Sequence, residues 1–430
     1  MSRACLRGRT WPVLAALFLP VLVGCGTNTA LPYGPPRPRD ASVDASRDAG
    51  VDASVLRCID VPVDGGPVQA ALSTDAEIGR ADVVFLIDVT SSMLEEISTI
   101  RRRLRDVIAP AIRSAIPDSE VAVATFADFP VRDYGTPPDD YPFRLNLPVT
   151  ADITQVQAAV DAITIRSGAD APEAQVEALY QLATGAGLGS YITPSPGCPS
   201  GGVGYACLRR DALPVVLLFT DAPFHNDAFG NHPYNVYTLG TAPHTAPETV
   251  AALNAIGARV IGFDSGDGDP RQDLEYFATR TDAIDASGQP LVYSIGTRGE
   301  RLGSQVVTAI RTFATTVVQD IDAVGRDPDP TDGVDPVTFV QAITPLSADP
   351  PDGVGGITST SFVEVVTGTK LTFQITIRPG SVVPGPMARL VPLEIVFRGN
   401  QRNRLGSEVV YLLIPGADGK TCADFGGVPP

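Results

Sequence analysis

The sequence has 430 residues, and its 49 Asp and Glu residues outnumber its 32 Lys and Arg residues, which gives a net charge of −17 at pH 7. No basic patch stands out against this excess, and phosphate binding needs clustered positive charge, so nucleic acid is excluded as a partner. The arginines at positions 101, 102, 103 and 105 lie within a helical pattern and are interpreted as a solvated helix face. The length suits two domains and a linker.

Residues 1–24 have the pattern of a secretory signal peptide. Three arginines precede an apolar run, residues 11–23, that is shorter than the roughly 20 residues of a membrane-spanning helix. The run ends in Leu22-Val23-Gly24-Cys25, which resembles the lipobox of bacterial lipoproteins. This resemblance implies acylation of Cys25 and attachment to a membrane through the lipid. The alternative is an ordinary signal peptide that contains a cysteine.

The next residue, Gly26, replaces the Asp that tends to retain Gram-negative lipoproteins at the inner membrane. We therefore expect an exported protein that is lipid-anchored at the outer membrane or cell surface. Residues 25–57 are predicted to form a disordered tether, rich first in proline and then in aspartate. Its like charges favour an extended chain.

Four cysteines remain after the signal peptide and the lipobox cysteine are set aside. An even number in an exported chain predicts two disulfides. Cys198 and Cys207 are close together in a Gly/Pro-rich loop and are expected to pair, which leaves Cys58 and Cys422 to pair by elimination. Free buried thiols are the alternative, and no pair has the spacing of a zinc site.

Between residues 80 and 322, strand and helix patterns alternate. Apolar runs predict strands at residues 83–87, 121–126, 144–149, 215–219, 260–263 and 291–295. Helical spacing recurs at residues 94–112, 156–163, 174–182, 274–278 and 305–318, with a kink expected at Pro110. Strands separated by helices predict an α/β fold, a doubly wound Rossmann-like domain with a mostly parallel six-stranded sheet.

The pattern changes after residue 322. An Asp/Pro-rich stretch, residues 327–333, is predicted to be a hinge because its spacing matches no known calcium loop. Apolar and polar residues alternate at 371–377, which indicates a strand with one face in water. Residues 362–366, 390–397 and 409–414 look similar. We expect residues 333–420 to form a small antiparallel β-sandwich domain.

The first buried strand of the α/β domain ends in Asp88-Val89-Thr90-Ser91-Ser92. A carboxylate and two hydroxyls at alternate positions are hard oxygen donors, which suit Mg²⁺, Mn²⁺ or Ca²⁺ better than zinc. Open α/β sheets bind their ligands at the carboxyl ends of the strands, where these residues lie. Helix capping by a hydroxyl is the alternative role for Thr90 and Ser92.

Three segments in residues 80–320 resemble the von Willebrand factor A family, and the integrin β-subunit variant of it in particular. FLIDVTSSM resembles the first loop of the metal-ion-dependent adhesion site, SGADAPEA the second, and LLFTDAPFH the third. The resemblance implies a sheet with strand order 3-2-1-4-5-6 and one antiparallel edge strand. It also implies a last helix that shifts when ligand binds and passes the change to the next domain.

The resemblance assigns metal-binding roles to five residues. It implies that Asp88, Thr90, Ser92, Glu173 and Asp221 hold a divalent ion, Mg²⁺ or else Mn²⁺ or Ca²⁺, some of them through water. One coordination position is then open for an acidic residue exposed on a protein partner.

Two flanking metal sites have partial counterparts. Glu95 and Glu96 stand where integrin β has two aspartates that bind a regulatory ion, although a polar first helical turn is the simpler interpretation. Four groups match ligands of a third ion, namely the side chains of Asp128, Asp170 and Glu173 and the Pro172 carbonyl, but Gly168 stands in place of an expected asparagine.

In integrin β, the sandwich beside this domain takes chain from both sides of it. We therefore expect the N-terminal segment, residues 58–79, to pack on the C-terminal domain. Residues 61–63 and 68–72 are apolar enough to add an edge strand there.

The resemblance implies a metal-dependent adhesion or interaction protein of the cell envelope and not an enzyme. A structural envelope protein with a stabilising metal is the alternative, and a metal-dependent hydrolase is the least favoured. A hydrolase needs a base that reaches the reacting water, and His225, His232 and His244 all lie in one long loop. His225 is interpreted as a structural residue of that loop. Ligand specificity is expected in residues 187–211 and 223–248.

Overall fold

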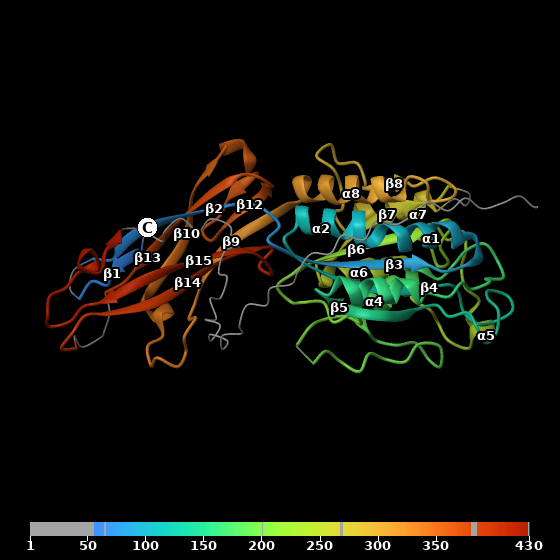
Figure 1. The fold of residues 1–430 in the computed structure, drawn as a ribbon, viewed down its shortest axis with the longest axis horizontal. Helices are drawn as coiled ribbons and strands as arrows, with labels where there is room; N and C mark the ends of the chain where they lie inside the picture. Colours follow the sequence, from blue (N-terminus) through green and yellow to red (C-terminus); the bar gives the residue numbers. More distant parts are fainter. Residues whose placement is uncertain (1–55, 64–65, 200, 267–269, 380–384, 429) are drawn as a thin grey trace, which may run out of the picture. The chain divides into compact units, whose positions relative to one another are not determined.

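The computed structural model describes residues 56–63, 66–199, 201–266, 270–379, 385–428 and 430 (Figure 1). The predicted signal peptide, Cys25 and almost all of the tether lie outside these ranges. Strands within the ranges form three sheets. None of the helices described there has both the length and the apolar run that a membrane span requires.

One of these sheets has six strands, in the order β5-β4-β3-β6-β7-β8. Its strands are β3 (Arg80–Asp88), β4 (Asp118–Phe126), β5 (Arg144–Thr150), β6 (Leu213–Thr220), β7 (Arg259–Asp264) and β8 (Val292–Ser294). The edge strand β5 is antiparallel to β4, and the other pairs are parallel. When these six strands are numbered from 1 to 6 along the chain, their order in the sheet is 3-2-1-4-5-6, with one antiparallel edge strand. This is the doubly wound, von Willebrand A-like arrangement that the resemblance implies.

Helices cover both faces of this sheet. They are α1 (Leu94–Arg103), α2 (Ala109–Ala115), α3 (Ile153–Asp161), α4 (Gln175–Thr184), α5 (Val236–Leu239), α6 (Ala246–Ala255), α7 (Arg271–Arg280) and α8 (Leu302–Thr316). Figure 1 shows α1, α2 and α8 along one face and α4 and α6 on the other. Strands β3, β6 and β7 are therefore almost wholly buried, which explains the apolar runs at residues 83–87, 215–219 and 260–263.

The helix predicted over residues 94–112 is divided in two by a π-helical turn, η2 (Leu104–Ile108). Pro110 follows in the first turn of α2. Proline has no backbone N–H and its ring clashes with the carbonyl one turn earlier, so the helix widens before it. Short 3₁₀ turns are η1 (Ser91–Met93), η3 (Pro336–Phe339), η4 (Pro351–Gly353) and η5 (Cys422–Phe425).

The two other sheets have seven and three strands within the described residues. The larger contains β1 (Leu56–Asp60), β9 (Val318–Arg326), β11 (Gly356–Ile357), β12 (Ser361–Val366), β14 (Arg389–Gly399), β15 (Asn403–Ile414) and β16 (Gly427–Val428), and the smaller contains β2 (Val68–Asp75), β10 (Val340–Asp349) and β13 (Lys370–Ile377). They share one apolar core, in which Phe373 of β13 contacts Phe362 of β12 and Phe397 of β14. Residues 318–322, expected in the α/β domain, begin β9 instead, because α8 ends at Thr316.

Segments before and after the six-stranded sheet contribute to the same pair of sheets. Strand β1 pairs in parallel with β15 and β16, and β2 is an edge strand antiparallel to β13. Residues 61–63, expected to add to an edge strand, follow the end of β1. The described residues contain two disulfides, as expected: Cys58 joins Cys422, and Cys198 joins Cys207.

Candidate metal centre

The carboxylate of Asp88 is held in place by the loop that follows it. Strand β3 ends at Asp88, and the chain turns through Thr90 into η1 and α1. The Thr90 backbone N–H and its hydroxyl both donate to Asp88 Oδ1, at 2.9 and 2.7 Å. Asp88 is fully buried, and these two bonds fix its orientation at the carboxyl end of the central strand.

A second loop approaches from the neighbouring parallel strand, β6. The Thr220 hydroxyl donates to Asp88 Oδ2 at 2.7 Å, and the Ser92 hydroxyl donates to Asp221 Oδ1 at 3.0 Å. Thr90 Oγ1 lies 3.2 Å from Ser92 Oγ. Asp88, Thr90, Ser92 and Asp221 therefore form one connected chain of oxygen atoms. The third sequence segment includes Thr220, but no role was predicted for it.

Glu173 belongs to the loop between α3 and α4 and is tied to the loop after β6. Its N–H donates to the Pro223 carbonyl at 3.0 Å, and the His225 N–H donates to the Glu173 carbonyl at 2.9 Å. A Cβ atom placed on Gly168 would lie 2.9 Å from Glu173 Oε1 and 3.6 Å from Thr90 Cγ2. Gly168 has a φ of +67°, and a side chain at this position would also crowd the Glu173 carboxylate.

The electrostatics of the cluster call for positive charge. Burial, reinforced by the nearby Asp221 carboxylate, raises the pKa of Asp88 to about 7. Burial, together with Asp88, raises the pKa of Glu173 well above its usual range. Within the described residues, no Lys, Arg or His forms an ion pair with Asp88 or Glu173, and Glu173 Oε2 is buried without a hydrogen-bond partner. Buried, uncompensated carboxylates beside hydroxyls fit a divalent cation with oxygen ligands.

The two glutamates at the start of α1 have different environments. The Glu95 side chain is 59% exposed, and its Oε2 lies 3.8 Å from Arg298 Nε. Glu96 is buried and accepts a hydrogen bond from the Ser265 hydroxyl at 2.8 Å. Burial raises the pKa of Glu96, and the bond from Ser265 opposes this. The two carboxylates therefore differ in exposure and in their partners.

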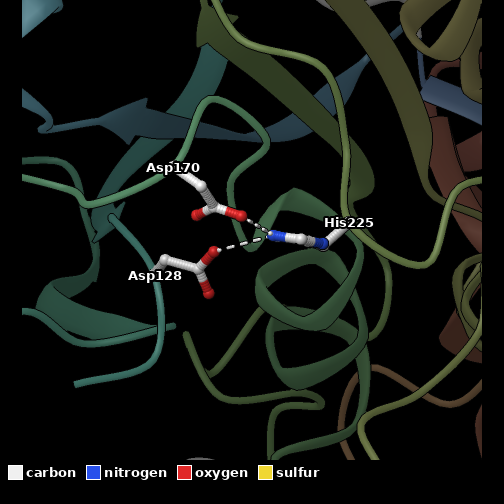
Figure 2. Close-up of side chains that lie close together, drawn as sticks. All are labelled: Asp128, Asp170 and His225. Atoms are coloured by element: carbon white, nitrogen blue, oxygen red, sulfur yellow. Dashed lines mark hydrogen bonds and ion pairs between the residues drawn. The ribbon is translucent and has the colours of Figure 1, made fainter. Parts of the chain in front are cut away.

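Asp128 and Asp170 meet a third side chain, that of His225 (Figure 2). His225 Nε2 lies 3.0 Å from Asp170 Oδ2 and 3.4 Å from Asp128 Oδ2. Among the described residues, these three form the one group of at least three Asp, Glu, His or Cys side chains whose donor atoms all lie within 4.8 Å of each other. The FH ending of the third segment is the sequence signal for this residue, but sequence alone predicts only a structural role for His225.

Burial raises the pKa of Asp128, whereas hydrogen bonds from the Tyr234 hydroxyl and the Phe129 N–H act in the opposite direction. Tyr234 belongs to the loop, residues 223–248, in which specificity was expected. In the same loop, Tyr237 of the short helix α5 is 93% exposed. This loop therefore connects the Asp128 carboxylate with an exposed aromatic side chain.

The sequence matches no protein-family model and no curated protein. The fold is similar to a solved von Willebrand factor type A protein from Catenulispora acidiphila, with 12% identity, 84% of this chain and 72% of that chain covered, and a TM-score of 0.36. Proximal thread matrix protein 1 from the mussel byssus is 16% identical over 57% of this chain and 50% of its own, with a TM-score of 0.35. Pilus adhesin SpaC from Lactobacillus rhamnosus GG is 12% identical over 82% of this chain and 45% of its own, with a TM-score of 0.32. The chain thus spans about half the length of the last two proteins. The fold assignment follows from its own strand order.

Proposed function

We propose that this chain is an exported, metal-dependent binding protein. In this proposal Asp88, Thr90, Ser92, Glu173 and Asp221 hold a divalent ion, Mg²⁺ or else Mn²⁺ or Ca²⁺, that binds an acidic side chain of a protein partner. The observation that carries the proposal is the pair of buried carboxylates, Asp88 and Glu173, with no cationic partner in the described residues and with the Thr90 and Thr220 hydroxyls bonded to Asp88. The ion would supply the positive charge that attracts the partner's carboxylate.

The residues of the chain have separate tasks in this site. Thr90 and Thr220 orient Asp88 from opposite sides, so the carboxylate needs little reorganisation to bind an ion. Ser92 is exposed whereas Asp88 is buried, which leaves the site open to a partner on the side of Ser92. The exposed Tyr237 offers an aromatic contact of the kind that is enriched in protein interfaces.

A binding role is favoured over hydrolysis by the state of His225. Catalysis by a base needs a nitrogen that can reach water at the reacting centre. Both ring nitrogens of His225 have partners, Nδ1 with the His232 carbonyl at 2.9 Å and Nε2 with Asp170. We therefore propose that the protein is not an enzyme.

Export and anchoring form the second part of the proposal. We infer that the chain is processed before Cys25 and held by its lipid at the outer membrane or cell surface. The lipobox-like sequence and the two disulfides support this, since disulfides persist in oxidising compartments. We also propose that the seven-stranded and three-stranded sheets are a β-sandwich domain that senses ligand binding, because a single residue, Val317, joins α8 to β9.

The test uses synthetic peptides that contain a central aspartate and matched peptides with asparagine instead. The exported chain is screened against both sets in Mg²⁺ and in EDTA, with the Asp88→Ala variant as the control. We expect binding that needs the aspartate and Mg²⁺ and that the variant lacks. Binding that is unchanged in EDTA or by aspartate replacement contradicts the proposal. Hydrolysis of a phosphate or ester substrate that depends on Asp88 contradicts the non-enzymatic role.

A further inference from the structure

The side chain of His225 faces three oxygen atoms that cannot donate hydrogen bonds to it when the carboxyl groups are ionised. Its Nδ1 lies 2.9 Å from the His232 carbonyl oxygen, which only accepts, so Nδ1 carries the hydrogen. In the neutral ring, Nε2 then presents a lone pair toward Asp170 Oδ2 at 3.0 Å and Asp128 Oδ2 at 3.4 Å (Figure 2). These three electron-rich atoms can be satisfied by a proton on Nε2 or by a metal ion bound between them.

The three donor atoms come from three separate loops and are held firmly. Asp128 is 0% exposed, and its Oδ1 accepts hydrogen bonds from the Tyr234 hydroxyl and the Phe129 N–H. Its Oδ2 is buried and has no hydrogen-bond partner in the described residues, and Figure 2 shows it directed at His225. His225 is 4% exposed. Two of the three ligands are therefore oriented in advance by neighbours that do not bind the ion.

The distances between the donor atoms fit a first-row transition metal. Zinc lies about 2.0–2.2 Å from nitrogen and carboxylate ligands, which places two ligands of one ion roughly 2.9–3.5 Å apart. The separations of 3.0 and 3.4 Å from Nε2 to the two carboxylate oxygens are within this range. The Asp170 side chain is 31% exposed, so an ion can enter from solvent and keep water as a further ligand.

We propose that Asp128, Asp170 and His225 form a second metal site, which takes a transition-metal ion such as Zn²⁺. The resemblance implied oxygen ligands alone at Asp128 and Asp170, but an imidazole nitrogen changes the class of ion, because Mg²⁺ and Ca²⁺ bind through oxygen whereas imidazole suits Zn²⁺ and its neighbours. The His232 carbonyl has the role of the outer-shell acceptor that fixes the tautomer of a metal-bound histidine. This site does not depend on the proposed function.

An ion at this second site would also stabilise the first. The His225 N–H donates to the Glu173 carbonyl, so the residues that carry the two sets of ligands are hydrogen-bonded to each other. An ion that joins the loops of Asp128, Asp170 and His225 thereby fixes the backbone on which Glu173 lies.

The test measures zinc affinity of the full exported chain, after dialysis against EDTA, by competition with a fluorescent zinc indicator. His225→Gln keeps an amide N–H for the carboxylates but removes the imidazole, and we expect its zinc affinity to fall roughly a hundredfold or more. His232→Gln is the matched control, because it keeps the backbone carbonyl, and its affinity should equal that of the unaltered chain. Binding of Co²⁺ should give a visible absorption spectrum that His225→Gln lacks.

Asp170→Asn is a second variant, at a partly exposed position, and its zinc affinity should fall as that of His225→Gln does. Asp88→Ala should bind zinc normally, which separates this site from the proposed Mg²⁺ centre. Equal zinc affinity in the unaltered chain, His225→Gln and Asp170→Asn overturns the proposal. So does an absence of zinc binding in the unaltered chain, or a loss caused by Asp88→Ala and not by His225→Gln.

Discussion

The Ser92 hydroxyl donates a hydrogen bond to Asp221 Oδ1 at 3.0 Å, although the two residues are 129 positions apart in the chain. The contact arises because β3 and β6 are adjacent parallel strands, whose carboxyl ends meet at one edge of the sheet. Asp88 is bonded to both loops there, by Thr90 and by Thr220. Two stretches of sequence thus supply a continuous set of oxygen donors.

Replacing Glu173 by glutamine should have opposite effects on stability and metal binding. In EDTA at pH 8, Glu173→Gln should raise the free energy of unfolding by about 1–3 kcal/mol, because it removes a buried charge that lacks a cationic partner. The same change should weaken Mg²⁺ binding, since the amide has no charge. Denaturant unfolding with and without Mg²⁺ measures both. Glu95→Gln, at an exposed carboxylate, is the control and should leave stability unchanged; a destabilised Glu173→Gln variant in EDTA would show that the carboxylate is satisfied without metal.

The pKa of Asp88 predicts how the metal-free protein responds to pH. Its folded value of about 7 exceeds the ordinary 3.8, so the folded state holds a proton that the unfolded state releases between these values. The contribution of Asp88 to stability in EDTA should therefore fall as pH rises from 3.8 to about 7. Mg²⁺ affinity should rise toward pH 7, because the ion needs the ionised carboxylate. Unfolding measured from pH 5 to 8 should show a weaker pH dependence in Asp88→Asn; identical curves argue against the assignment.

Much of the α/β fold could be predicted because it depends on local pattern. Unbroken apolar runs mark strands buried on both faces. Asp88, Thr90 and Ser92 are close together in the sequence because they lie at the end of one such strand and in the turn that follows it. The position of His225 could not be predicted, because its contact with Asp170 joins two loops 55 residues apart. Nor does periodicity reveal that β1 pairs with β15 and β16, since short apolar segments fit many partners.

We predict that Arg209 stabilises the folded chain, through a buried ion pair that is not part of the proposed metal centre. Its Nε donates to Asp82 Oδ1 at 2.7 Å, and Asp82 is fully buried in β3. Burial raises the pKa of Asp82 to about 6 even with Arg209 present, which opposes the shift. Arg209→Ala leaves this carboxylate without its charge partner and should lower the free energy of unfolding by about 3 kcal/mol. Arg210→Ala, at the exposed neighbouring arginine, should change it little; equal effects of the two variants would contradict the role of the buried pair.

The two disulfides should differ in their contribution to stability. Cys58 and Cys422 are separated by 364 positions, and Cys198 and Cys207 by 9. By the chain-entropy model, the long loop contributes about 6 kcal/mol and the short loop about 2–3 kcal/mol. Replacing Cys58 and Cys422 by serine should therefore lower the melting temperature more than replacing Cys198 and Cys207. The reverse order, or recovery of Cys58 linked to Cys198 or Cys207 in non-reduced peptides, contradicts this arrangement.

The most direct test of the proposed metal-dependent function is calorimetric titration of MgCl₂ into the EDTA-dialysed chain and its Asp88→Ala variant at pH 8. At this pH the Asp88 carboxyl is ionised in most molecules. We predict saturable Mg²⁺ binding in the unaltered chain and no measurable binding in the variant, while both unfold cooperatively in EDTA. Equal Mg²⁺ affinity in a folded Asp88→Ala variant would contradict a metal centre at Asp88.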